Sequence, residues 1–122
     1  MRTIGIGFRA AAQQSSLQDA LAQVLMATDN QSFDAVVTEA AKARDPIFRT
    51  FATEIGVPGL GVTQSDLTRM ITPTQSQRIR DRFGTGSLAE AAALAAAGPN
   101  AQLVVSRVVS TDGMATAALA EG

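Results

Sequence analysis

The sequence predicts a single α/β domain, a three-layer sandwich around a mainly parallel sheet of about five strands that ends in an antiparallel hairpin. Short apolar segments with the alternation of a strand recur along the chain, and helical segments separate them. The last two strand-like segments, 103–109 and 114–119, flank a Ser-Thr-Asp-Gly turn of the kind that joins hairpins. With 122 residues, 46% of them hydrophobic, and no linker or repeat, the chain has material for one core.

The helices of the first half are predicted from their ends. Ser15 with Gln18 has the pattern of a capping box, in which short polar side chains bond the free N–H groups of a first turn. Asp45 before Pro46 combines an N-cap acid with a first-turn proline, and Gly56 is typical of the left-handed residue that ends a helix.

Three further capping patterns predict the helices of the second half. Thr63, Thr74 and Ser87 each stand three residues before an Asp, Gln or Glu. The first two predict short helices, the second of them rich in arginine, and Ser87 begins the alanine-rich helix 88–97, whose small side chains permit close packing on a sheet. The strands expected before the hairpin are 3–8, 33–38 and 57–62.

The composition excludes several kinds of chemistry. The chain has no His, Cys, Trp or Tyr, which removes imidazole or thiolate zinc sites, disulfides, Ser-His-Asp triads and haem ligation through these residues. We therefore expect no metal site and no cofactor, and any acid–base group must be Asp, Glu or Lys. Nine of the ten cations are arginine and Lys42 is the only lysine; coding bias explains this as well as function does.

Charge and hydropathy point to a protein of the cytoplasm. The net charge of −1 gives no general attraction to nucleic acid or to an anionic membrane. The longest apolar run, 91–98, is far shorter than the roughly 18 residues of a membrane span, and no signal-peptide core follows Arg2. We expect neither nucleic acid nor membrane as a partner.

Two candidate ligand-binding segments follow the first two strands, because ligands of open α/β sheets bind beyond the carboxyl ends of parallel strands. Gly5 and Gly7 allow a ligand to approach the backbone, and Arg9 is placed to clamp an oxyanion. The alternative for the glycines is tight packing of a helix on the strand. Lys42 is a charged contact or, if desolvated, a base; the alternative is a solvated lysine beside Asp45.

The third candidate is the start of the alanine-rich helix. Thr85, Gly86 and Ser87 offer backbone N–H groups and hydroxyls, which together suit an anion at a helix N-terminus. Glu90 is either the partner in the capping box or an acid–base group. Lys42 and Glu90 are thus the only catalytic candidates, and the residues alone name no reaction.

Several segments together carry a family resemblance. In their order and spacing over nearly the whole chain they resemble the small CobE family of aerobic cobalamin synthesis, which is similar to the C-terminal domain of CbiG, the hydrolase of the anaerobic route. The chain departs from the family pattern at 10–12, where alanines replace a glycine, and at Arg107, where lysine is usual. The matching segments are Gly5-Ile-Gly-Phe-Arg9, Val37-Thr-Glu-Ala-Ala-Lys42 with Asp45-Pro46, Ile55-Gly-Val-Pro58, Gly84-Thr-Gly-Ser-Leu-Ala-Glu-Ala-Ala92 and the hairpin 103–120.

The resemblance implies a single CobE/CbiG C-terminal-like domain over residues 1–122 that handles a precorrin or corrin intermediate. CbiG opens a ring-A lactone and releases acetaldehyde, but the standalone family looks more like a binder, carrier or accessory factor. A precorrin-directed hydrolase and a regulatory domain that binds other cobalamin-pathway enzymes are the alternatives. Without His or Cys to ligate a ring metal, we expect the ligand to be held by its peripheral carboxylates.

Overall fold

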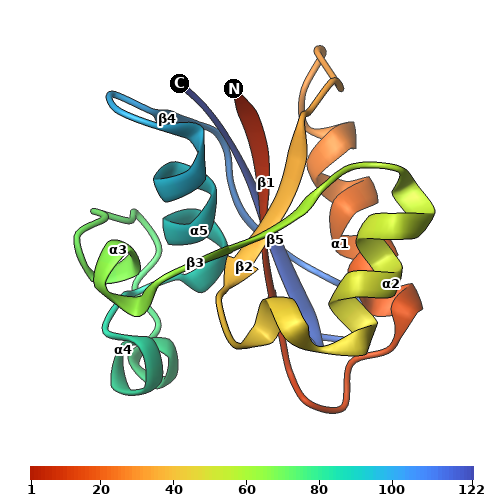
Figure 1. The fold of residues 1–122 in the computed structure, drawn as a ribbon, viewed down its shortest axis with the longest axis horizontal. Coiled ribbons are helices and arrows are strands. Elements are labelled where there is room, and N and C mark those ends of the chain that lie inside the picture. Colours follow the sequence, from red (N-terminus) through yellow and green to blue (C-terminus); the bar gives the residue numbers. More distant parts are fainter.

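The computed structural model describes all 122 residues and has a five-stranded sheet between two layers of helices (Figure 1). Helices α1 and α2 cover one face, and α5, with α3 and α4 beside it, covers the other. The strands are β1 (Arg2–Phe8), β2 (Ala35–Glu39), β3 (Gly59–Val62), β4 (Gln102–Val109) and β5 (Ala115–Glu121). The helices are α1 (Gln14–Met26), α2 (Pro46–Ile55), α3 (Gln64–Thr68), α4 (Gln77–Phe83) and α5 (Leu88–Ala97), with a 3-10 turn η1 (Lys42–Arg44).

The sheet is mixed, with the strand order β3-β2-β1-β5-β4. Strand β1 pairs parallel to β2, and β2 parallel to β3, whereas β5 pairs antiparallel to both β1 and β4. The α/β class, the five strands and the hairpin are confirmed, but the expectation of a mainly parallel sheet is wrong. The reason is that β5 lies between β1 and β4, so the hairpin contributes an interior strand that is antiparallel to both of its neighbours.

This topology still brings four carboxyl ends to one edge. Because β4 is antiparallel to β5, and β5 is antiparallel to β1, strands β1 to β4 all run in the same direction. The ends of β1, β2, β3 and β4 therefore meet at the edge where β5 begins.

Helix α5 lies very close to β1. A Cβ added at Gly5 would stand 1.8 Å from the carbonyl oxygen of Ala89, so only glycine permits this approach. Next to it, the buried Thr3 hydroxyl donates to the carbonyl oxygen of Ala93 at 2.7 Å. Gly5 thus has the packing role that was one of its two sequence interpretations.

The predicted helix caps are confirmed at some helices and wrong at others. Asp45 caps α2 by accepting from the Ile47 N–H at 3.0 Å, and Thr63 and Ser87 cap α3 and α5. Helix α1, however, begins after Gln13 rather than at Ser15. Helix α4 begins after Ser76 rather than Thr74, because Thr74 is bonded to Glu90.

None of the helices has the length and hydropathy that a membrane-spanning helix needs.

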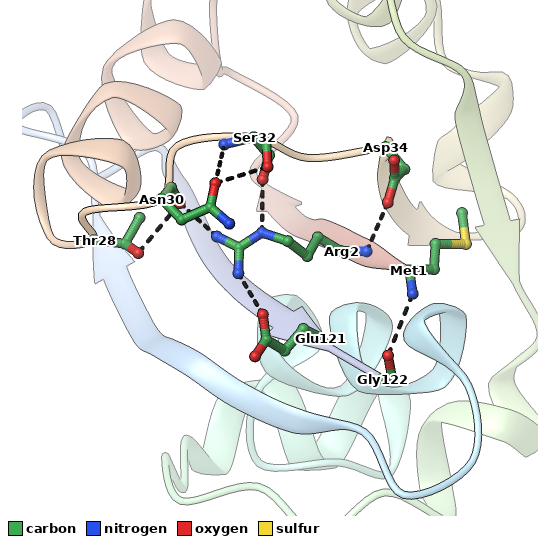
Figure 2. A network of polar contacts seen from close by, with 8 residues as sticks. All are labelled: Met1, Arg2, Thr28, Asn30, Ser32, Asp34, Glu121 and Gly122. Atoms are coloured by element: carbon green, nitrogen blue, oxygen red, sulfur yellow. Dashed lines mark hydrogen bonds and ion pairs between the residues drawn. The ribbon is translucent and has the colours of Figure 1, made fainter.

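The opposite edge of the sheet is closed by a polar network around Arg2 (Figure 2). The Arg2 guanidinium pairs with Glu121 at 2.5 Å and donates to the carbonyl oxygen of Ser32 at 2.8 Å, while its backbone N–H bonds Asp34. This network joins the start of β1 to the end of β5 and to the loop before β2. Arg2 is therefore bonded at the edge where β1 begins, opposite the edge where the carboxyl ends of β1 to β4 meet.

Candidate functional site

A cleft of about 170 Å³ lies at the carboxyl edge of the sheet, beneath α4. Its walls come from the end of β1, the turn η1, helix α4, the end of β4 and the start of β5. Sequence reasoning placed the ligand site at this edge from the general behaviour of α/β sheets. Five of the lining side chains are cationic and none is acidic; the cations are Arg9, Lys42, Arg78, Arg82 and Arg107.

Four different parts of the fold supply these cations. Arg9 directly follows β1, and Lys42 belongs to η1, which follows β2. Arg107 lies on β4, which runs in the same direction as β1. Arg78 and Arg82 are four residues apart on α4, a spacing that places them on one helix face.

The positive charge of the cleft is not neutralised within the protein. The two ion pairs of the molecule are Arg2–Glu121 and Arg69–Asp66, and neither involves a cleft residue. The nearby acids Glu39, Asp45 and Glu90 lie outside the lining and accept from backbone N–H groups, so the lining itself carries only positive charge although the whole chain is nearly neutral. Guanidinium groups that are free of protein partners suit carboxylates or phosphates.

Lys42 is half-buried, as is Arg107, whereas the other three cations are exposed. Its Nζ donates to the carbonyl oxygen of Phe8 at 2.7 Å and lies 4.4 Å from the centre of the Phe8 ring. Burial lowers the pKa of Lys42 from its ordinary value, and the positive charge of Arg82 lowers it further, while Asp45 and Glu39 act in the opposite direction. The surroundings of Lys42 therefore favour loss of its proton relative to an exposed lysine.

Glu90 does not line the cleft; it is fully buried behind it. Its carboxylate accepts from the Thr74 N–H at 2.9 Å, the Thr74 hydroxyl at 2.8 Å and the Arg107 N–H at 2.8 Å. Its own N–H donates to Ser87 Oγ at 3.2 Å. Glu90 thus joins α5 to β4, which carries Arg107, and to the segment that leads into α4, which carries Arg78 and Arg82.

The start of α5 is covered by the segment before α4. A Cβ on Gly86 would stand 2.5 Å from the Thr74 carbonyl oxygen, and the Gly86 carbonyl accepts from the Ser76 N–H at 2.7 Å. Thr85 and Ser87 are buried, and neither lines the cleft. The structure therefore does not bring the expected amide cradle of residues 85–87 to the cleft.

Comparisons with known proteins identify the family. The family described as Cobalamin synthesis G C-terminus matches residues 2–120. The chain belongs to this family. The resemblance seen in the sequence is confirmed, and the chain is a protein of cobalamin biosynthesis.

Solved structures agree with this assignment. CobE, a protein of the cobalamin biosynthetic pathway, is 27% identical with a TM-score of 0.84, and the match covers 98% of this chain and 92% of CobE. The cobalamin biosynthesis protein chiG from Agrobacterium tumefaciens is 30% identical with a TM-score of 0.76, and the match covers 99% of this chain and 98% of chiG.

A third structure shows the fold alone. A cobalamin biosynthesis protein G homolog from Sulfolobus solfataricus is 20% identical with a TM-score of 0.70, over 98% of this chain but only 36% of the homolog. The comparison with curated proteins gives no match.

Within this cobalamin synthesis G C-terminal domain, the cleft gathers some of the predicted ligand-binding residues and not others. Gly7, Arg9 and Lys42 line it, whereas Gly5, Thr85, Gly86 and Ser87 do not. The sequence indicates that the arginines before residue 85 could add charge to an anion site, but it does not identify Arg78, Arg82 and Arg107 as members of one site. The four-residue spacing of Arg78 and Arg82 was a usable signal, but the position of Arg107 depends on a strand order that local patterns do not reveal.

Proposed function

We propose that the protein binds a polycarboxylate precorrin or corrin intermediate of cobalamin biosynthesis and acts as a carrier or accessory factor. The supporting observation is the convergence of five cations in a cleft at the carboxyl edge of the sheet, with no acid among its lining residues. Planar guanidinium groups bind carboxylates through two parallel hydrogen bonds. Several carboxylates around one ring match several arginines around one cleft.

The size of the cleft supports a peripheral mode of binding. Pockets that enclose a drug-sized ligand measure about 300–1,000 Å³, whereas this cleft measures about 170 Å³. A tetrapyrrole is larger than such ligands, so its ring stays outside and only the carboxylate side chains of one edge enter. Arg78 and Arg82 on α4 then hold them from one side, and Arg9 and Arg107 from the sheet side.

The chemistry of the cleft favours binding over hydrolysis. Its lining contains no carboxylate, and Glu90, the other catalytic candidate of the sequence, has its oxygens occupied by three protein donors. Among the cations that line the cleft, Lys42 is the only one whose side chain can act as a base, because the other four are arginines, and burial lowers the pKa of Lys42 from its ordinary value. A precorrin-directed enzyme that depends on Lys42 is therefore the second candidate.

The experiment is a titration of the protein with hydrogenobyrinic acid, followed through the absorbance of the corrin ring. Arg82→Gln removes one charged partner and is expected to weaken binding by about tenfold, which corresponds to about 1.4 kcal/mol. Arg80→Gln is the matched control, because Arg80 lies on the same helix but bonds Gln75 and does not line the cleft.

Equal losses in the two variants would show that only overall charge matters, and no absorbance change with the unaltered protein would overturn the proposal. A corrinoid whose carboxylates are all converted to primary amides is expected to bind far more weakly, because amides carry no charge for the arginines to pair with. If instead the protein transforms a precorrin and Lys42→Ala abolishes turnover with binding retained, the enzymatic alternative holds.

A further inference from the structure

The position of Lys42 gives it a chemical property that the arginines of the cleft lack. Its Nζ makes one protein hydrogen bond, to the carbonyl oxygen of Phe8 at 2.7 Å, and lines the cleft beside Arg82. An amine that loses its proton is a nucleophile, whereas a guanidinium stays protonated in proteins. Lys42 is also the only lysine of the chain.

Of the charges around Lys42, the two arginines disfavour its protonated form, whereas Asp45 and Glu39 favour it. On the cleft side it faces Arg82 and Arg78, and the two nearby acids are engaged with backbone groups. Glu39 accepts from the Ala41 N–H at 2.8 Å, and Asp45 caps α2.

Neither acid forms an ion pair with Nζ. The ring and carbonyl of Phe8 offset part of the cost of the charge, but the pKa of Lys42 is lowered overall, first by burial and then by Arg82.

We propose that Lys42 forms an imine with an aldehyde or ketone whose carboxylate or phosphate group is held by the neighbouring arginines. The inference rests on the proposed anion-binding function of the cleft. The Nζ lone pair attacks the carbonyl carbon and forms a C–N bond, and proton transfer from nitrogen to oxygen gives a carbinolamine. Loss of one water then leaves the C=N bond, so no oxidant or reductant takes part.

The geometry supports this step in two ways. A neutral Lys42 amine still donates one N–H to the Phe8 carbonyl, which fixes the nitrogen at the cleft wall and leaves its lone pair free. Arg82 and Arg78, which line the same cleft and whose charges act on Lys42, are placed to hold an anionic group near that nitrogen. Holding both reactants in one site replaces a bimolecular encounter by an intramolecular one.

The test is reductive labelling with pyridoxal 5′-phosphate and borohydride, with the modified sites read by mass spectrometry. The Met1 amine serves as the internal reference in every sample. Arg49→Lys adds a lysine on the exposed surface of α2, outside the cleft, as a matched control in the same molecule. Lys42 is expected to be labelled severalfold faster than this control lysine, because burial and then Arg82 lower the pKa of Lys42 and so raise its fraction of free amine, and because the arginines hold the phosphate of the reagent beside it.

Two further arms separate charge steering from simple reactivity. Pyridoxal without the phosphate is expected to lose most of the preference for Lys42 over the control lysine, because the arginines have no anion to hold. Glyoxylate with cyanoborohydride is the carboxylate counterpart and is expected to keep that preference. Arg82→Gln is expected to slow the labelling of Lys42 and to move its pH dependence toward higher pH.

The outcomes also distinguish this inference from the proposed function. Equal labelling of Lys42 and the control lysine at residue 49, with hydrogenobyrinic acid still bound, overturns the imine inference alone. Absence of corrinoid binding, with no protection of Lys42 by the corrinoid, overturns the proposed function. Fast labelling that the corrinoid blocks supports both.

Discussion

Replacing Glu90 by Gln tests whether this buried carboxylate is structural. The substitution keeps the shape of the side chain but exchanges one carboxylate oxygen for an NH₂ group. In the native protein one oxygen accepts from the Thr74 N–H, and the other accepts from the Thr74 hydroxyl and the Arg107 N–H. Whichever way the amide is turned, at least one backbone N–H faces another donor.

The magnitude follows from the bonds that are lost. A buried donor left without an acceptor costs about 1–3 kcal/mol, and the loss of a charged acceptor lies in the upper part of that range. We expect Glu90→Gln to lower the free energy of unfolding by about 2 kcal/mol. For a domain of this size that corresponds to a fall in Tm of roughly 6–10 °C.

The assay is urea and thermal unfolding of the variant beside the wild type, with Thr74→Val as the matched control. Thr74→Val removes only the hydroxyl donor and leaves both backbone N–H groups bonded, so its cost is expected to be smaller, about 1 kcal/mol. An unchanged Tm for Glu90→Gln, together with a loss of corrinoid turnover or binding, would refute the structural interpretation. It would return Glu90 to the catalytic role considered from the sequence.

Two other predictions concern the packing of α5 and the β4–β5 turn. Gly5→Ala places a Cβ 1.8 Å from the Ala89 carbonyl oxygen, so the variant is expected to unfold at a much lower temperature or to be insoluble, as checked by circular dichroism. Asp112 accepts from the Ser110 and Ser16 hydroxyls at 2.6 Å each, and these bonds, that from Ser110 first, lower the pKa of Asp112. Its stabilising contribution is therefore present above the unfolded-state pKa and is lost as the pH falls through the lower folded-state value. The stability difference between wild type and Asp112→Asn should accordingly be clear in urea at neutral pH and vanish in acid; a difference that persists in acid would contradict this assignment.

Local signals in the sequence were sufficient for most elements and insufficient for the sheet order. Asp45 and Ser87 cap their helices as predicted because the capping interaction involves only residues two or three positions away. Thr74 has the same local pattern, yet its N–H and hydroxyl bond Glu90, sixteen residues away in sequence, and the cap passes to Ser76. A long-range acceptor of this kind cannot be predicted from residues that are close in sequence.

The candidate site follows the same distinction between local and long-range signals. Arg9 and Lys42 can be predicted as site residues because each follows a strand, and the strand is recognisable from the residues just before it. Arg107 reaches the cleft only because β5 inserts between β1 and β4 and thereby aligns β4 with β1. The amide cradle at residues 85–87 was a sound local expectation, but the segment before α4 covers it.

The two proposed properties of the cleft, polycarboxylate binding and imine formation at Lys42, should differ in their pH dependence, because most of the cations in the cleft are arginine. Four of its five cations are guanidinium groups, which keep their charge throughout the range in which the protein is folded. Binding of a polycarboxylate should therefore change little between about pH 6 and pH 9, where the carboxylates of the ligand are also ionised. Imine formation depends on free amine at Lys42 and should increase as the pH rises, and it should do so at lower pH than for an exposed lysine, because burial and Arg82 lower the pKa of Lys42. A single pH series should measure both the affinity for the corrinoid and the rate of Lys42 labelling. If the arginines supply the attraction, the affinity stays constant while the labelling rate rises. If Lys42 supplies the main attraction, the affinity falls as the labelling rate rises, because the free amine carries no charge.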